Sequence, residues 1–462
     1  MKWIRSAPCK VALLAALATV LSACQINVDW AQWGNGVERI GESGAESTLG
    51  TGNVSQLQHL WSVNLGSQIN SAPILASGLD VNGTTKDVIY VGSEHGVLFA
   101  VTTEGQIIWY RYLGANTRPD CMSTIDGVHG VSASAVFDRA RNRVYAADGN
   151  GKVWALNPTT GAVVPGWPIT YSADGLHDIV ESAPTLIGNH LYVETASYCD
   201  VGPYRGRVLD INPDTNAIAH TWFVNLTLSQ GGSVWGWGGA SVDAANGDVY
   251  VATGNAITPP ENQPYADSVV RLSSDLTVKA FHSPAPMIAD DDFGTTPTLF
   301  RKSGCPPQLV VEQKNGSLYL YDRDAITTGY RQRIQFGQPD LIGVAAYSTR
   351  SKMIYVVNGK GSADGTYIPG LAAFNLDADC KLALAWQTPA SVSIGTTPTV
   401  ANGVVYYAGG FRGTIHALDA VNGTELWNSG TTITGAVLAA PIVVNGRLYA
   451  AGYDNYLHAW GL

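Results

Sequence analysis

The chain repeats one pattern of short apolar runs separated by tight polar turns. In the clearest copy, Asn402-Gly403 joins Thr399 to Ala401 with Val404 to Ala408, and two further runs follow, Thr414 to Leu418 and Glu425 to Trp427. Asn-Gly between apolar alternations predicts a β-hairpin, because a type I′ turn needs a positive φ at both central positions. Each copy is therefore predicted to be a four-stranded antiparallel sheet.

The same unit starts eight times along the chain. Its copies run over residues 71–109, 133–167, 182–222, 240–281, 296–330, 344–386, 395–427 and 439–460. A four-stranded sheet of this size cannot bury both of its faces alone, so the units must stack on one another. A period of about 40–60 residues with four strands favours a β-propeller. We therefore expect an all-β fold, an eight-bladed propeller.

The last unit ends at Trp460 after only three strands, whereas Gln56 to Leu65 forms a strand-like run without a unit of its own. Pairing this N-terminal run with the eighth blade would close the ring and remove an exposed sheet edge. Residues 56–462 are thus predicted to form the propeller. The Gly-rich stretch from residue 24 to 55 is expected to be a loose strap or tether.

Composition agrees with a single repetitive β domain. The 462 residues include 51 Gly and 22 Pro, and only 14% are charged, which indicates many turns and many short buried segments. No change in composition divides the chain into halves, so one large domain is favoured over two or three ordinary ones.

The N-terminus has the features of an export signal. Lys2, Arg5 and Lys10 precede an apolar run, Val11 to Leu21, which is short for a membrane-spanning helix. The run ends in Leu-Ser-Ala-Cys24, which resembles the lipobox of bacterial lipoproteins. The resemblance implies cleavage of residues 1–23, lipidation of Cys24 and, with Gln25 next, attachment to the periplasmic face of the outer membrane. An ordinary signal peptide with an incidental cysteine is the alternative.

Cleavage would remove three basic and no acidic residues, so the net charge would change from −10 to −13. Nucleic acid is excluded as an expected partner, because phosphate binding requires a basic surface. Membrane contact is expected through the lipid anchor only.

The repeat Ala-Leu-Asp-x-x-x-Gly-x-x-x-Trp, seen from Ala417 to Trp427 and in part from Ala155 to Gly161, resembles the pyrroloquinoline-quinone (PQQ) propeller repeat. The resemblance covers the chain from about residue 56 to its end. Two functional classes share this repeat: quinoprotein alcohol dehydrogenases, which hold PQQ and Ca²⁺ over the axis, and non-catalytic propellers that act as envelope assembly scaffolds. The repeat alone does not choose between them.

Blade-specific segments resemble the dehydrogenases more closely. Trp235-Gly-Trp237 is similar to the segment that supplies the tryptophan stacked on the quinone, and Asp292, before Phe293, matches the catalytic aspartate. Lys314 matches the Arg or Lys that contacts the quinone oxygens. The resemblance thus implies cofactor binding by Trp235, Trp237 and Lys314, with Asp292 as the general base.

Two further positions match calcium ligands. Asn255 in Ala-Thr-Gly-Asn corresponds to a calcium-binding asparagine, and Asp200 stands where the family has a glutamate. In a propeller, connections between second and third strands and connections between blades emerge on one face, so these side chains are expected to share one mouth. Carboxylate and amide oxygens suit a hard cation such as Ca²⁺.

Structural explanations remain for each of these residues. Asp and Asn are common in turns, as Asp148 and Asp454 illustrate, the run around Asp292 could be solvated loop charge, and Lys314 an ordinary turn residue. The two tryptophans could simply cap the axial channel.

Departures from the dehydrogenase pattern also weaken the resemblance. Asp200 is shorter than a glutamate, Asn70 replaces a glutamate that several members carry near the cofactor, and Met122 follows Cys121 where many members have a Cys-Cys pair. The chain has no Cys-x-x-Cys-His, so we expect no covalent haem. The leading hypothesis is PQQ- and Ca²⁺-dependent oxidation of an alcohol in the cell envelope with a separate electron acceptor. The alternative is a cofactor-free propeller that binds envelope proteins as a scaffold.

The mature chain would keep four cysteines available for disulfides. The predicted strand order places Cys121 and Cys199 on the face of the expected cofactor site, and Cys305 and Cys380 on the opposite face. Two disulfides, Cys121 with Cys199 and Cys305 with Cys380, are therefore predicted.

Overall fold

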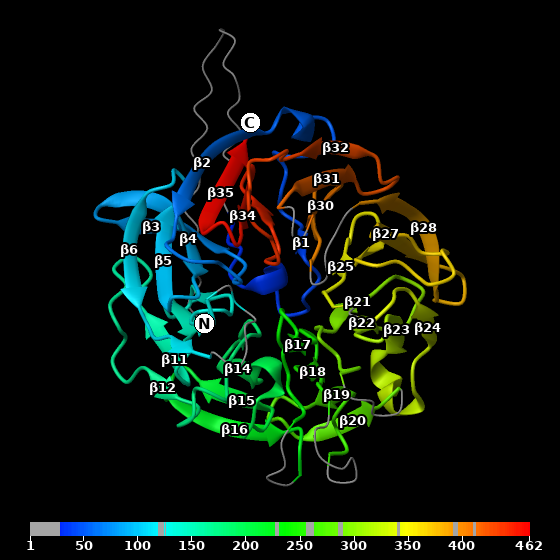
Figure 1. The fold of residues 1–462 in the computed structure, drawn as a ribbon, viewed down its shortest axis with the longest axis horizontal. Coiled ribbons are helices and arrows are strands. Elements are labelled where there is room, and N and C mark those ends of the chain that lie inside the picture. The colour runs from blue at the N-terminus through cyan, green and yellow to red at the C-terminus, as the bar shows by residue number, and fades with distance from the viewer. Residues whose placement is uncertain are drawn as a thin grey trace, which may run out of the picture.

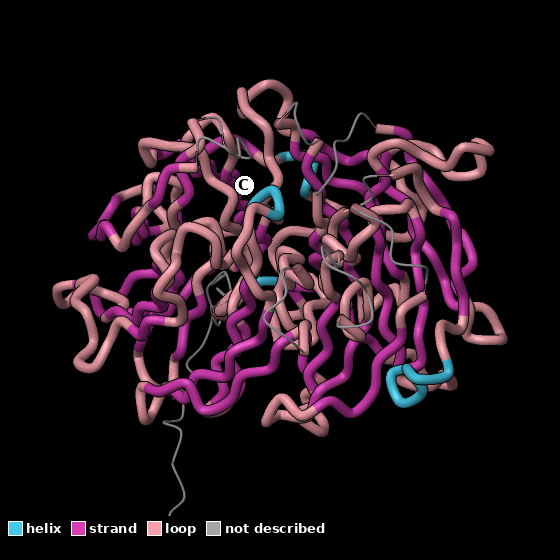
Figure 2. The backbone as a smooth tube through the Cα atoms, turned by 60° about the horizontal axis from the view of Figure 1, so that its bottom comes forward, coloured by secondary structure: helices cyan, strands magenta, loops and turns pink. Residues whose placement is uncertain are grey.

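Eight antiparallel sheets surround a central axis in the computed structural model, which confirms the predicted eight-bladed propeller (Figure 1). The structure describes residues 28–118, 124, 126–226, 231–255, 263–284, 290–339, 342–390, 396–409 and 413–462. Strand and loop make up almost all of the described chain, with only a few short helical turns (Figure 2). None of the helices in these ranges has the length and apolar character needed to cross a membrane.

The first four blades follow one another along the chain, each with four strands. They are β3 (Ile74–Val81), β4 (Thr84–Gly92), β5 (Val97–Thr102) and β6 (Ile107–Tyr112); β9 (Val136–Asp138), β10 (Arg143–Ala147), β11 (Lys152–Leu156) and β12 (Ile169–Thr170); β13 (Thr185–Ile187), β14 (His190–Thr195), β15 (Arg207–Asn212) and β16 (Ala217–Phe223); and β17 (Ser241–Val242), β18 (Val249–Ala252), β19 (Val269–Leu272) and β20 (Val278–His282).

The other four blades repeat this order. They are β21 (Thr298–Phe300), β22 (Gln308–Gln313), β23 (Ser317–Asp322) and β24 (Gln332–Gln335); β25 (Ala346–Tyr347), β26 (Ile354–Asn358), β27 (Gly370–Leu376) and β28 (Leu382–Pro389); β29 (Thr399–Ala401), β30 (Val404–Ala408), β31 (Ile415–Asp419) and β32 (Glu425–Asn428); and β33 (Ile442–Val444), β34 (Arg447–Ala451), β35 (Tyr456–Gly461) and β2 (Gln58–Asn64). A short hairpin, β7 (Asn116–Thr117) with β8 (Val128–His129), lies between the first two blades.

The ring closes as the sequence predicts. Strand β2 pairs antiparallel with β35, from Gln58 opposite Gly461 to Asn64 opposite Tyr456, so the N-terminal strand completes the last blade. Figure 1 shows the two strands side by side, β2 in blue and β35 in red. Closure removes the free edge that the three-stranded C-terminal sheet would otherwise expose.

The Gly-x-x-x-Trp part of the repeat holds neighbouring blades together. The tryptophan of one blade packs on the turn glycine of the next, and a Cβ on that glycine would lie within 3 Å of the indole. These pairs are Trp61 with Gly105, Trp109 with Gly161 and Trp386 with Gly423. All three glycines also have a positive φ, so the repeat requires glycine both for space and for backbone conformation.

The strap before the propeller is packed, not loose as expected. It includes η1 (Trp33–Asn35), β1 (Glu42–Ser43) and η2 (Val54–Gln56), and β1 adds a parallel fifth strand to the seventh blade. Amides of first strands donate to carbonyls of the strap around the ring: Leu75 to Trp30, Phe137 to Ala31, Val242 to Val37, Leu299 to Glu38, Tyr347 to Ile40 and Val400 to Gly41.

Arg39 anchors the strap from inside. Its fully buried guanidinium donates to the carbonyls of Trp33 (2.7 Å), Pro184 (3.0 Å) and Ala240 (3.3 Å). The strap therefore links the first strands of the blades to one another.

The predicted disulfide between Cys305 and Cys380 is present and joins the fifth blade to the sixth. Cys199 is also disulfide-bonded. Its predicted partner Cys121, like the lipidation site Cys24, lies outside the described residues, so that pairing and the lipidation stay predictions.

Candidate active site

A cavity of about 220 Å³ opens among the connections of the third to fifth blades. It is lined by Glu181, Ser197, Tyr198, Cys199, Asp200, Ser233, Trp235, Asp290, Asp292 and Lys314. Four of the six predicted cofactor, metal and catalytic residues, namely Asp200, Trp235, Asp292 and Lys314, thus line the same cavity. Their convergence follows from the topology, because second-to-third strand connections and inter-blade connections emerge on the same face.

Asp292, Trp235 and Lys314 form one contact group in this cavity. The indole Nε1 of Trp235 donates to Asp292 Oδ2 at 2.7 Å, and Lys314 Nζ lies 3.2 Å from Asp292 Oδ1. The same ammonium bonds to Asp290 and lies 5.4 Å from the centroid of the Trp235 ring. Gly294 makes room for this arrangement, because a Cβ there would lie 2.3 Å from Cη2 of Trp235.

The electrostatics of this group favour proton transfer. Burial raises the pKa of Asp292, and the hydrogen bond from Trp235 and the charge of Lys314 offset this only in part. Burial opposes the charged form of Lys314, but Asp292 and Asp290 outweigh it, so the pKa of the ammonium is raised. A buried carboxylate with a raised pKa beside a lysine that stays charged suits a general base next to a stabiliser of negative charge.

Asp200 enters the cavity from an unusual backbone conformation. It ends η3 (Tyr198–Asp200), and both Cys199 and Asp200 have a positive φ, near +54° and +52°. The hydroxyl of Tyr204 donates to Asp200 Oδ1. Non-glycine residues seldom adopt this conformation, and surrounding contacts must hold them there.

Asn255 and Trp237 do not line this cavity. Asn255 is buried in the second-to-third connection of the fourth blade, where its carbonyl accepts a hydrogen bond from Gly232 N at 2.8 Å. Trp237 lies against a separate small cavity near the axis, together with Trp33 and Asn70. The position of Trp237 agrees with the alternative in which it caps the axial channel.

Glu181 borders both cavities and was not predicted from the sequence. Burial and the neighbouring Glu94 charge raise the pKa of Glu181 to about 8. The raised pKa favours the neutral form of this carboxyl group.

Asp267 is a second residue that sequence reasoning missed. Its amide donates to the carbonyl of Gly254 at 3.1 Å, which places it beside Asn255 in the same connection. Its side chain is 2% exposed, and neither carboxylate oxygen has a hydrogen-bond partner among the described residues. Burial, followed by the charges of Asp292, Asp291 and Asp200, raises the pKa of Asp267 to about 7. Its place in the same strand connection as Asn255 is the signal that could have identified it.

The donor set fits a hard cation shared with a cofactor. Asp200, Asn255 and Asp267 offer only oxygen ligands, which Ca²⁺ prefers, and the unpartnered oxygens of Asp267 are free to take one. Within the described ranges, no three acidic, histidine or cysteine side chains lie close enough to enclose a metal by themselves. A bound cation would therefore need further oxygens, such as those of a carboxylate cofactor. The indole of Trp235 and the ammonium of Lys314 suit a flat anionic ring system.

The eight repeated sheets and the matching family model define the chain as a PQQ-repeat propeller. It belongs to the family described as Outer membrane protein assembly factor BamB, whose model matches residues 45–222 and 381–462, just over half of the chain.

Individual relatives come from both functional classes. A polyvinylalcohol dehydrogenase from a Pseudomonas species is 23% identical over 495 aligned positions, which cover 92% of this chain and 73% of the relative. A europium-containing methanol dehydrogenase superposes with a TM-score of 0.73 at 16% identity, covering 94% of this chain and 98% of the other. BamB from Moraxella catarrhalis gives a TM-score of 0.58 at 15% identity and 88% and 100% coverage. At these identities the solved structures show a shared fold.

Proposed function

We propose that this propeller oxidises an alcohol with PQQ and Ca²⁺ bound at the mouth. The observation that carries the proposal is the contact group of Asp292, Trp235 and Lys314, in which a buried carboxylate meets an indole and an ammonium in one cavity. A scaffold without a cofactor has no need of this arrangement. The similarity to a polyvinylalcohol dehydrogenase along most of the chain supports the same class of reaction.

Each residue of the mouth would have a separate role in the reaction. Asp292 would accept the hydroxyl proton of the alcohol, because its raised pKa makes it a better base than an ordinary aspartate. Lys314 would stabilise negative charge on an oxygen held near it, and Trp235 would support the flat face of the cofactor. PQQ, when bound, supplies the acceptor for the two electrons and the hydrogen that leave the alcohol carbon. Asp200 and Asn255 would hold the cation.

The setting is proposed from the N-terminal pattern. Lipidation of Cys24 would hold the propeller on the periplasmic face of the outer membrane, where a separate protein or small molecule would take the electrons onward. The absence of a Cys-x-x-Cys-His from the sequence supports an external acceptor, because the chain offers no site for a covalent haem.

Reconstitution with PQQ and Ca²⁺ tests the proposal. The purified protein should acquire the absorbance of bound quinone and reduce an artificial dye when an alcohol is added. Asp292→Asn should lower kcat by about 100-fold or more, since it removes the base but keeps the side-chain shape. Asp291→Asn, one residue away and outside the cavity lining, is the matched control and should change kcat less than about threefold.

A non-catalytic envelope scaffold is the second candidate function, and the family model described as BamB favours it. Under that function the quinone absorbance would be absent, and no alcohol in a panel from methanol to a polymeric polyol would support dye reduction. This result would overturn the dehydrogenase proposal.

A further inference from the structure

The buried carboxylate of Asp267 has no counter-charge in the described part of the chain. It is 2% exposed, and both of its oxygens lack a hydrogen-bond partner there. Burial of a carboxylate without a partner is strongly unfavourable, so such a group either holds a proton or awaits a cation. Its position beside the proposed cofactor mouth favours the second role.

The surroundings of Asp267 are negative. Asp292, Asp291 and Asp200 are the charges that act on it most strongly. Lys314, the lysine that lines the cavity, contacts Asp290 and Asp292. Carboxylates therefore outnumber bases at this point, and a divalent cation would restore the balance.

Backbone hydrogen bonds hold the acidic residues together. Asp267 N donates to Gly254 O at 3.1 Å, directly before Asn255, and Phe293 N donates to Thr253 O at 3.3 Å, directly after Asp292. The connection from β18 to β19, which carries Asn255 and Asp267, is thereby joined to the connection between the fourth and fifth blades, which carries Asp292.

We propose that Asp267 belongs to the cation site, where a Ca²⁺ ion bound beside Asn255 neutralises its buried charge. The inference rests on the proposed function for the presence of a cation, but it concerns cation affinity and not the oxidation step. The proposed site thus contains Asp267 in addition to Asp200 and Asn255. Neither the repeat nor the family resemblance indicates Asp267. Asp267 would raise the affinity of the site by supplying charge that the apoprotein leaves unbalanced.

Asp267→Asn tests this inference, because it removes the charge and keeps the shape of the side chain. Ca²⁺ binding, measured by titration calorimetry with and without PQQ, should weaken by at least about tenfold. Melting in EDTA should rise by about 1–2 °C, because an unpaired buried charge is gone. The melting increase that Ca²⁺ gives the unaltered protein should shrink in the variant.

Asp248→Asn is the matched control, since Asp248 is equally buried in the same blade but bonds to Arg271 and Lys279. It should lower the melting temperature with and without Ca²⁺ and leave Ca²⁺ affinity unchanged. Asp267→Ser serves as a second variant in case Asp267→Asn does not fold.

Separate results would overturn separate claims. Equal Ca²⁺ affinity in Asp267→Asn and the unaltered protein, or no Ca²⁺ binding by either, overturns the role of Asp267. A fall of the melting temperature in EDTA, as expected for Asp248→Asn, overturns it as well. Binding of Ca²⁺ that depends on Asp267 without any dye reduction would support this inference and reject the dehydrogenase activity.

Discussion

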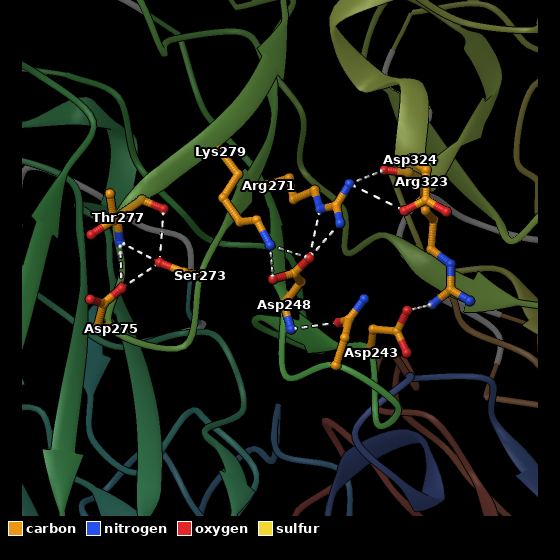
Figure 3. A network of polar contacts seen from close by, with 10 residues as sticks. Asp243, Asp248, Arg271, Ser273, Asp275, Thr277, Lys279, Arg323 and Asp324 are labelled. Carbon is orange, nitrogen blue, oxygen red and sulfur yellow. Dashed lines mark hydrogen bonds and ion pairs between the residues drawn. The ribbon is translucent and has the colours of Figure 1, made fainter.

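Buried aspartates at the two ends of the fourth blade differ in whether they have charged partners. At the end where β17 turns into β18, Asp248 accepts hydrogen bonds from Arg271 Nε at 2.8 Å and from Lys279 Nζ at 2.7 Å, and Asp243 pairs with Arg323 at 3.1 Å (Figure 3). At the other end, where β18 leads into β19, Asp267 is buried without any such partner in the described chain.

The comparison separates carboxylates that hold the fold from those available to a ligand. A buried ion pair whose members satisfy each other loses stability when either member is removed. A buried carboxylate left unsatisfied lowers the stability of the empty protein and gains a partner only on binding. The same residue type in one blade can therefore serve stability at one face and binding at the other.

The largest expected effect on stability is at the end of the blade where Asp248 is paired with Arg271 and Lys279. Asp248→Asn leaves Arg271, which is 15% exposed, without its main counter-charge, and should lower the free energy of unfolding by about 3 kcal/mol. Guanidinium chloride unfolding in EDTA and in Ca²⁺ should show the same loss. If Ca²⁺ restored the free energy of unfolding of Asp248→Asn, cation binding would also involve the Asp248 ion pairs. The two ends of the blade would then not differ in their response to the cation.

Most of the fold could be predicted from the sequence because its signals are local. Asn402-Gly403, which marks a hairpin, and the Gly-x-x-x-Trp spacing, which marks the packing between blades, each lie within one repeat. The packed strap could not be predicted, because its contacts are long-range. Arg39 bonds to carbonyls at Pro184 and Ala240, about 150 and 200 residues further along the chain, and nothing near Arg39 indicates them.

The candidate site was predictable where topology decides it. Strand order alone brings Asp200, Trp235, Asp292 and Lys314 to one cavity. Asp267 was missed because an aspartate in a strand connection has the same sequence appearance whether it is paired or not. Its distinguishing property, a buried carboxylate without a partner, arises only from tertiary packing.

Glu312 is a buried carboxylate that does not line the cavity of Asp292 and Lys314, and it should show pH dependence without a cation effect. Burial alone raises the pKa of Glu312 to about 8, from an ordinary value near 4.5, and no neighbouring charge contributes. Its folded-state pKa is raised, so its contribution to stability is complete below about pH 4.5 and is lost as the pH rises toward 8.

Glu312→Gln should therefore flatten the fall in stability over that interval and raise the free energy of unfolding at pH 9 by about 1 kcal/mol. Unfolding curves from pH 5 to 9, in EDTA and in Ca²⁺, provide the measurement. If the effect of Glu312→Gln on the free energy of unfolding differed between EDTA and Ca²⁺, Glu312 would belong to the cation site, as proposed for Asp267.

The smallest expected effect has the opposite sign to that of Asp267→Asn. Lys314 lies 3.2 Å from Asp292 and so opposes a cation at the mouth. Lys314→Gln should tighten Ca²⁺ binding by about two- to fivefold, since removal of a like charge at a partly exposed position is worth about 0.5–1 kcal/mol. Calorimetric titration at two salt concentrations checks this, because screening should reduce the gain. Weaker Ca²⁺ binding by this variant would mean that Lys314 holds the carboxylates in position for the ion. The Ca²⁺ affinity would then depend on the positions of the carboxylates more than on the net charge of the site.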